Sequence, residues 1–326
     1  MRIAFASCMT PFRFPSQPAW NDVALANPDE LVLLGDSVYY DADGASTGEV
    51  KAMNASQFAA HAHFRLSRQL AVPEFRALVG RPVLRTHAIW DDHDFLWNNA
   101  CGAEVAGQPD LRHLVPPARA MFAVYRKALS AHLAPGSFPA SPPPFGADTP
   151  APGYSNVVLR DSVLLHLTDG RSFKGRLGRR ALLGTAQFDA MEAAMQAADA
   201  ADPLTVHLVA SGVVFEARHG ECWLDCEPEY NRMLGLATRH RILMLSGDIH
   251  DNNVAAYALP GGKLLFEATS SGAAVKTAVT IGTEQRNYGL LDIDAHQVQV
   301  RIFKFGDLQF HIAIDRATWQ GVAPQD

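Results

Sequence analysis

Short apolar runs, separated by polar, glycine-containing or proline-containing segments, dominate this 326-residue chain. Such runs predict strands, and a run without alternation predicts a strand covered on both faces, as in a parallel sheet. Helical segments interrupt the early strands, whereas the last four strands follow one another with few interruptions. The predicted strands are IAFAS, LVLLG, VLRTHAIW, NVVLR, VLLHLTD, TVHLVAS, ILMLSG, VAAYAL, KLLFEATS, LLDID and VQVRIFKF.

Helical periodicity, with apolar residues three and four positions apart, is clearest in residues 55–70, 117–133 and 184–200. Thr185 is placed to act as the N-cap of the third helix. The alternation of early strands with helices and the late hairpins are typical of an α/β domain with two sheets and external helices. We find no internal repeat and interpret the proline-rich residues 134–153 as a surface loop. The prediction is therefore a single domain over residues 1–326.

The composition limits the classes of function. Hydrophobic residues make up 48% of the chain and charged residues 19%, as in a packed globular protein. The formal net charge of -6 argues against a stable complex with nucleic acid, and no apolar run is long enough to cross a bilayer. Four cysteines are too few for a disulfide scaffold, and the first residues lack the apolar segment of a secretory signal. We expect a cytoplasmic protein, or an exported one if the sequence is a trimmed mature form.

Polar side chains of the types that bind metals or catalyse reactions follow two of the predicted strands. In RILMLSGDIH the apolar run leads to Asp248 and His250, and in LVLLGDSVYYD a second run leads to Asp36 and Tyr39. Because ligand sites in open α/β sheets gather beyond the carboxyl ends of the strands, these side chains are expected to lie together. An Asp and a His at such a position can bind metal, act as acid and base, or simply begin a loop. A single Gly-Asp after a strand is most often a turn.

Further groups of this kind are Asp92, His93, Asn98 and Asn99 in WDDHDFLWNNA, Cys8 in IAFASC, and Asp169 and Arg171 in LTDGRSFKG. Each alone has an ordinary explanation: a solvated acidic loop, a cysteine packed as a small hydrophobe, and a salt bridge between Arg171 and Asp169. Together they gather acids at one sheet edge, where cations are needed to offset the repulsion. Oxygen ligands with histidine suit magnesium, manganese, calcium, iron or zinc, and two such ions can clamp a phosphoryl group and activate water.

The motifs, taken in order, resemble those of the PhoD-like alkaline phosphatases, within the metallophosphoesterase (calcineurin-like) superfamily. The resemblance implies a four-layer αββα sandwich of two mixed β-sheets flanked by helices. It also implies hydrolysis of phosphate esters with metals as the only cofactors. The matching segments, which span nearly the whole chain, are ASC, GDSVYYD, WDDHDFLWNN, TDGRSFKG, LLGTAQFDAMEAAM, LSGDIH, FEATSSG and NYGLLDID.

The resemblance implies a ligand set for two or more metal ions. Asp36 would bridge two ions, and a thiolate from Cys8 with a phenolate from Tyr39 would favour iron, or zinc, at one position. Calcium, magnesium or manganese would occupy the neighbouring position. The remaining ligands implied are Asp248, His250, and either Asn98 or Asn99, which the spacing does not distinguish.

The resemblance also implies that Asp92, His93 and Arg171 are catalytic. His93 would assist protonation of the leaving group, and Arg171 would contact the phosphate, with Asn98 and Asn99 as further substrate contacts. We therefore predict a metal-dependent hydrolase of small-molecule phosphate monoesters or diesters that uses a metal-activated hydroxide. The alternative is a catalytically idle metal- or nucleotide-binding module on the same fold. An aspartyl-phosphate phosphatase is disfavoured, because the first strand ends in a cysteine and lacks an Asp-x-Asp nucleophile.

Overall fold

The layers of the fold follow from the alternation of side chains along the central strands. In β1 (Arg2–Met9), Ala4 and Ala6 belong to one hydrophobic cluster, whereas Ile3 and Phe5 belong to another. Successive residues of a strand face opposite sides of its sheet, so an uninterrupted apolar run is buried on both faces. Such a strand needs a covering layer on each side.

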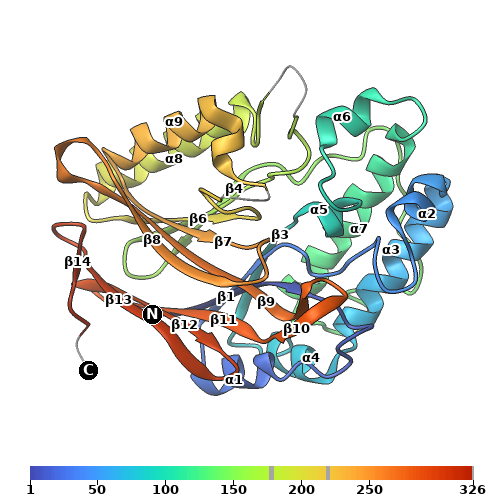
Figure 1. Cartoon of the computed structure of the whole chain (residues 1–326), viewed down its shortest axis with the longest axis horizontal. Helices are drawn as coiled ribbons and strands as arrows, with labels where there is room; N and C mark the ends of the chain where they lie inside the picture. The colour runs from blue at the N-terminus through green and yellow to red at the C-terminus, as the bar shows by residue number, and fades with distance from the viewer. Residues whose placement is uncertain (176–179, 218–220, 325–326) are drawn as a thin grey trace.

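The computed structural model describes residues 1–175, 180–217 and 221–324, which form two packed groups of strands with helices outside (Figure 1). The 14 strands are connected by hydrogen bonds, and the two groups meet where β1 pairs with the later half of β9. The first group is β3 (Arg85–Ile89), β2 (Glu30–Leu34), β1, β11 (Asn287–Ile293), β12 (Gln297–Lys304), β13 (Asp307–Asp315) and β14 (Gln320–Val322). The second group is β4 (Ser155–Leu159), β5 (Val163–Leu167), β6 (Val206–Ser211), β7 (Arg241–Ser246), β9 (Leu264–Ala278), β8 (Asn252–Ala258) and the short β10 (Ile281–Gln285).

Helices cover the outer face of each strand group. In Figure 1, α8 and α9 lie over the second group, and α3 and α7 lie on the other side of the molecule. The helices are α1 (Ala19–Ala26), α2 (Thr47–Ala52), α3 (Ala55–Leu70), α4 (Pro73–Val79), α5 (Asp92–Phe95), α6 (Gly102–Gly107), α7 (Val115–Ser130), α8 (Thr185–Ala201) and α9 (Glu227–Ala237). Helix α8 begins at Thr185 with Gly184 at its N-cap, so the prediction that Thr185 is the N-cap is wrong.

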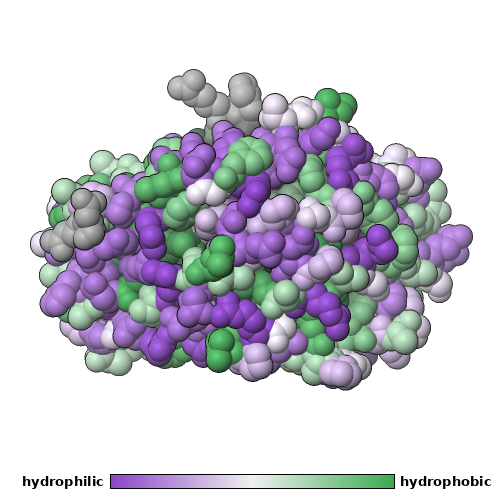
Figure 2. All heavy atoms as spheres, turned by 90° about the horizontal axis from the view of Figure 1, so that it is seen from below, coloured by the Kyte–Doolittle hydropathy of each residue, from purple (hydrophilic) through white to green (hydrophobic). Residues whose placement is uncertain are grey.

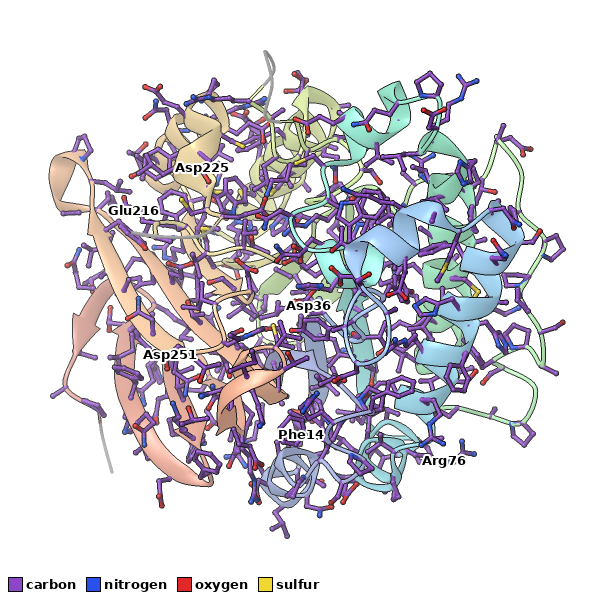
Figure 3. All side chains as sticks on the ribbon, turned by 45° about the vertical axis from the view of Figure 1, so that its right-hand side comes forward. Phe14, Asp36, Arg76, Glu216, Asp225 and Asp251 are labelled. Carbon is purple, nitrogen blue, oxygen red and sulfur yellow. The ribbon has the colours of Figure 1, made fainter. Side chains whose placement is uncertain are left out.

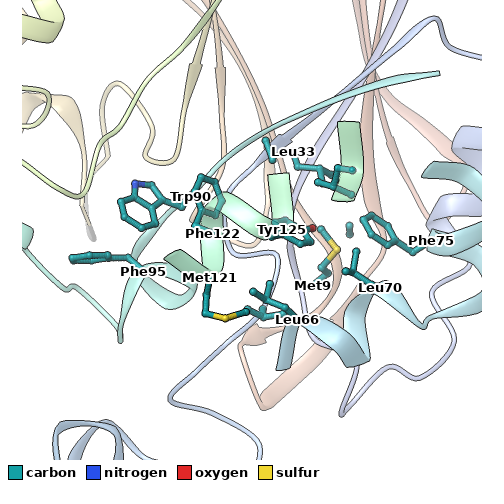
Figure 4. Close-up of a cluster of buried hydrophobic side chains, with 14 of the residues drawn as sticks. Met9, Leu33, Leu66, Leu70, Phe75, Trp90, Phe95, Met121, Phe122 and Tyr125 are labelled. Carbon is teal, nitrogen blue, oxygen red and sulfur yellow. The ribbon is translucent and has the colours of Figure 1, made fainter. Parts of the chain in front are cut away.

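Three large hydrophobic clusters of described residues fill the spaces between the four layers. The first, part of which is shown in Figure 4, packs the first strand group against α1, α3, α4 and α7. The second lies between the strand groups and joins Val32 of β2 to Leu243 of β7. The third packs Met244 of β7 against Met191 of α8 and Met233 of α9. The predicted αββα sandwich is therefore confirmed.

The remaining surface features agree with a packed globular protein. On the face shown in Figure 2, hydrophobic and hydrophilic residues are interspersed. Residues 134–153, predicted to form a surface loop, contain neither helix nor strand. Within the described ranges, no helix combines the length and the apolar character that crossing a bilayer requires.

Candidate metal centre

The carboxyl ends of β1, β2, β3 and β7 meet near the middle of the molecule, where Figure 3 shows Asp36. Five of the predicted metal ligands have a positive backbone φ: 62° at Cys8, 51° at Asp36, 63° at Asn99, 72° at Asp248 and 52° at His250. This conformation costs roughly 1–3 kcal/mol for a residue with a side chain and persists only where the surroundings enforce it. The backbone is therefore bent, against its preference, at the positions that carry the chemistry.

Cys8, Asp36 and His250 form the first group of possible ligands, with one ligand atom from each lying within 4.8 Å of the others. The Cys8 thiol lies 3.6 Å from Asp36 Oδ2, and the Tyr39 hydroxyl lies 2.9 Å from His250 Nε2. His250 Nδ1 is 3.1 Å from the Thr277 carbonyl oxygen and donates its proton there. The lone pair of Nε2 is thus directed toward Tyr39 and the group, an arrangement typical of metal-binding histidine.

Two further groups adjoin the first one. Asp36, Asp92 and His93 form the second group, and Asp91, Asp92 and Asp248 form the third. Asp36 belongs to the first two groups and Asp92 to the last two, so the possible ligands form one continuous row. The structure thus places Asp36 where a bridging ligand is needed, and its bridging role stays a prediction.

The contacts of Asp91 give the most direct evidence that cations can bind along this row. A Cβ added at Gly35 would lie 2.5 Å from Asp91 Cβ, and one added at Gly212 would lie 2.3 Å from Asp91 Oδ1, so both glycines are required for the close packing. Arg171 Nε donates to Asp91 Oδ1 over 2.5 Å. Asp91 Oδ2 is buried and accepts no hydrogen bond from the described residues. This oxygen remains available to a bound cation.

The electrostatics of the row also favour cations. Burial raises the pKa of Asp36 and Asp91 well above their usual range. Burial, with the nearby Asp92 carboxylate, raises the pKa of Asp248 to about 6, and burial raises the pKa of the Cys8 thiol to about 11. These groups resist becoming negative because they are removed from water beside other acids. A multivalent cation reverses this preference and suits the mixed carboxylate, imidazole and thiol donors.

His93 is held at the edge of this row by Asp41, which the sequence prediction did not include. His93 Nδ1 lies 2.5 Å from Asp41 Oδ1. Burial alone would lower the pKa of His93, but Asp92, Asp36 and Asp41 outweigh it and raise the pKa to about 10. His93, Asp41 and Asn98 line an open cavity of about 390 Å³. His93 therefore lies at the wall of a space that a substrate can enter.

Arg171 is fully buried and its guanidinium has three carboxylate partners, of which Asp92 is the most distant at 3.8 Å. Besides the bond to Asp91, its Nη1 lies 2.5 Å from Glu221 Oε2, which also lies 2.7 Å from Lys174 Nζ. The Asp169 side chain accepts hydrogen bonds from Trp90 Nε1 and from backbone N–H groups. The alternative explanation, a salt bridge between the Arg171 and Asp169 side chains, is therefore wrong. Contact of Arg171 with phosphate stays a prediction, and its observed contacts hold Asp91 in place.

The two candidate asparagines occupy different environments. Asn98 is exposed, and its backbone N–H donates to Asp41 Oδ2 over 2.8 Å. Asn99 is half-buried with a φ of 63°, and its backbone N–H donates to Asp92 Oδ2. Asn99 thus lies closer to the ligand row, and the roles of both side chains stay predictions.

Sequence reasoning missed several residues that complete this site. Asp91 was visible as the first acid after a strand, but neither Ser271 nor Glu221 gives a recognisable signal. Ser271 lies inside β9, where its hydroxyl is 3.2 Å from the Cys8 sulfur and accepts a hydrogen bond from the His250 N–H. These contacts depend on the joining of the two strand groups, which a local pattern does not reveal.

No protein-family model and no curated protein sequence matches the chain. Among solved structures, that of PhoD is similar, with a TM-score of 0.67 and 16% sequence identity over 100% of this chain and 72% of that chain. The resemblance to PhoD that the motifs indicated is thus confirmed in the fold. TT1561 of Thermus thermophilus has a TM-score of 0.42, with 10% identity over 97% of this chain and 98% of that chain. Zinc-bound Vps29 from Entamoeba histolytica has a TM-score of 0.37, with 7% identity over 97% and 99% of the chains. The last two scores are too low to support an argument.

Proposed function

We propose that this protein is a metal-dependent phosphoesterase that hydrolyses small-molecule phosphate monoesters, diesters or both. The observation that carries the proposal is the continuous row of ligand groups in which Asp36 and Asp92 are each shared by two neighbouring groups. Such sharing is what a site for two adjacent cations requires. Cations held there would lower the pKa of a bound water and offset negative charge on the phosphoryl oxygens.

The donor atoms differ along the row and predict different ions at its two ends. Cys8, Tyr39 and His250 offer sulfur, phenol and imidazole donors, which suit iron or zinc. Asp91, Asp92 and Asp248, with the shared carboxylate of Asp36, offer oxygen donors, which suit calcium, magnesium or manganese. An amide oxygen from Asn98 or Asn99 would complete the second position.

The remaining side chains act on the substrate or on the ligands. Since Asp41 engages His93 Nδ1, Nε2 is the nitrogen left to donate a proton to the leaving-group oxygen. Arg171 orients Asp91 and compensates its charge. The charge of -6 means that a phosphate ester relies on this local site and not on the field of the whole protein. We extend the proposal to a cytoplasmic location without a nucleic-acid partner.

The test is turnover of p-nitrophenyl phosphate and bis(p-nitrophenyl) phosphate by protein purified without chelator, with metal content measured on the same sample. We expect activity that is lost on dialysis against a chelator and restored by one or more of the proposed ions. Asp189→Asn, at an exposed position of α8, is the control for Asp36→Asn. Metal binding without turnover of either ester would instead support the catalytically idle module.

A further inference from the structure

A second cluster of possible ligands lies between the second strand group and α8. His207 is the second residue of β6, His240 immediately precedes β7, and Asp199 is on α8. In Figure 1, α8 passes over these strands. The candidate metal centre follows the carboxyl ends of its strands, whereas His207 and His240 are at the amino ends of theirs. The cluster is therefore separate from that centre.

The three side chains converge on a single carboxylate. His207 Nε2 lies 2.9 Å from Asp199 Oδ1, and His240 Nδ1 lies 2.7 Å from Asp199 Oδ2. One ligand atom from each residue lies within 4.8 Å of the other two. The side chains of His207 and His240 are 0% and 6% exposed, whereas that of Asp199 is 20% exposed. An ion can thus approach from solvent along the carboxylate and reach two buried imidazoles.

A chain of hydrogen bonds orients the His207 ring through Nδ1, the nitrogen that does not contact Asp199. Its Nδ1 lies 3.1 Å from His166 Nε2, and His166 Nδ1 lies 2.7 Å from the Tyr154 hydroxyl. Metal-binding histidines usually make such a bond with their second nitrogen, which fixes the ring and the tautomer. His207 has this outer partner already in place.

One imidazole nitrogen of the cluster has no hydrogen-bond partner among the described residues, and it is not the nitrogen that contacts Asp199. This nitrogen is the buried Nε2 of His240. The cluster presents one carboxylate shared by two buried imidazoles.

We propose that Asp199, His207 and His240 bind a divalent transition-metal ion of the zinc class, at a site distinct from the phosphoesterase centre. Two imidazoles and one carboxylate are donors that zinc and its neighbours in the first transition series accept readily. Hard ions such as magnesium prefer a shell of oxygens and are disfavoured by a set with two imidazoles. The proposal does not depend on the proposed phosphoesterase function.

Binding needs no change in the number of protons on the cluster. Without metal, Tyr154 donates to His166 Nδ1, His166 Nε2 donates to His207 Nδ1, and both His207 and His240 donate to Asp199. With metal, His207 carries its proton on Nδ1 and donates it to His166 Nε2. His166 then carries its own proton on Nδ1 and donates it to the Tyr154 oxygen. The His240 proton moves to Nε2. The ion thus replaces the two protons that Asp199 accepted, and the number of protons on the three imidazoles is unchanged.

A metal at this position would join three elements that are distant in sequence. It would connect α8 to β6 and to the start of β7, and its binding free energy would add to the stability of that layer. We therefore expect a structural ion whose removal lowers the melting temperature of the protein.

The test is the number of zinc ions bound per chain at equilibrium, after stripping with a chelator and refilling with zinc chloride alone. We expect His240→Gln and Asp199→Asn each to bind one ion fewer than the wild type, while turnover of nitrophenyl phosphates is retained. His311→Gln, which changes a partly buried histidine in β13, is the matched control and should bind as the wild type does. Equal zinc content in the wild type and in both cluster variants would overturn the proposal.

A second measurement decides the question if the variants do not fold. Crystals of the wild-type protein, grown with zinc chloride, should give an anomalous difference peak at the zinc absorption edge between Asp199, His207 and His240. Zinc peaks confined to the row around Asp36 would overturn the proposal, whatever the activity of the protein.

Discussion

The imidazole of His93 and the carboxylate of Asp41 are paired at 2.5 Å, although 52 residues separate them in the chain. Asp41 also accepts the backbone N–H of Asn98 at 2.8 Å and the hydroxyl of Thr47 at 2.9 Å. These bonds fix the carboxylate, which in turn fixes the ring of His93. A pair of this kind orients an acid and keeps it protonated.

Asp41→Asn is expected to weaken His93 as a general acid. The substitution removes a negative charge beside the imidazole, so the pKa of His93 falls and the loss of activity at alkaline pH begins at a lower pH. We expect kcat for alkyl phosphates to fall by about 10²–10⁴-fold. The effect on nitrophenyl phosphates should be small, because nitrophenolate leaves without protonation. Equal losses on both substrate classes in a pH series would contradict the assignment of His93 as the acid.

Asp36→Asn and Asp248→Asn test the shared and terminal carboxylates of the row. An amide keeps the shape of the side chain but not its charge, so the affinity for cations falls. We expect each variant to retain the fold, to bind less metal and to lose several orders of magnitude in kcat. Circular dichroism, metal analysis and nitrophenyl phosphate turnover check the three expectations. Wild-type activity in metal-replete Asp36→Asn protein would exclude a bridging role.

The sequence predicted the fold well where burial on both faces leaves a continuous apolar run, as in β2 and β7. It missed β13, in which Asp307–Asp315 includes exposed and half-buried positions and polar residues. It also missed short helices such as α2 (Thr47–Ala52), which shows only one buried residue. The signal for an element is thus its buried face, and elements with little buried surface give little signal.

The site was predictable to the extent that its residues follow strands. Asp36, Asp248 and Cys8 were found because a carboxylate or thiol after an apolar run is a local pattern. The partners of Arg171 were not found, since Asp91 and Glu221 are 80 and 50 residues away from it. Pairing at such separations depends on how the layers pack, which no spacing in one segment specifies.

Arg171→Ala is expected to destabilise the protein as well as the metal centre. The substitution leaves Asp91 and Glu221 buried without their shared cation. Removing one partner of a buried ion pair costs about 3–5 kcal/mol in the free energy of unfolding. Urea denaturation measures this loss, and Arg171→Lys should retain part of the stability. A rise in KM with unchanged stability would instead support direct contact of Arg171 with phosphate.

Glu221→Gln tests the same network through the pH dependence of the melting temperature, Tm. Burial would raise the pKa of Glu221, but Arg171 and Lys174 lower it from 4.5 to about 2. A carboxyl group whose pKa is lower in the folded than in the unfolded state stabilises the protein at pH values above its unfolded-state pKa. This contribution is lost as the pH falls through its folded-state pKa. The difference in Tm between the wild type and Glu221→Gln should therefore be constant above about pH 5 and narrow from 4.5 toward 2. A constant difference down to about pH 3 would show that the contribution is not ionic.

Cys8→Ala tests whether the buried thiol binds metal or only packs. Cys8 is 0% exposed and contacts Tyr39 and Val275 in a small apolar cluster, which by itself agrees with a packing role. Its sulfur, however, lies 3.6 Å from Asp36 Oδ2, and it occupies the point where the register between β1 and β9 shifts. A thiol buried for packing alone has no need of a carboxylate neighbour or a positive φ.

We expect Cys8→Ala to lose about one metal ion per chain and most of its activity, since a thiolate ligand cannot be replaced by a methyl group. If the ion is ferric iron, the wild-type protein is coloured in concentrated solution and the variant is not. Cys226→Ala, at another buried cysteine, is the control and should lose stability without losing metal. Unchanged metal content in Cys8→Ala, measured by elemental analysis on folded protein, would assign Cys8 to the core.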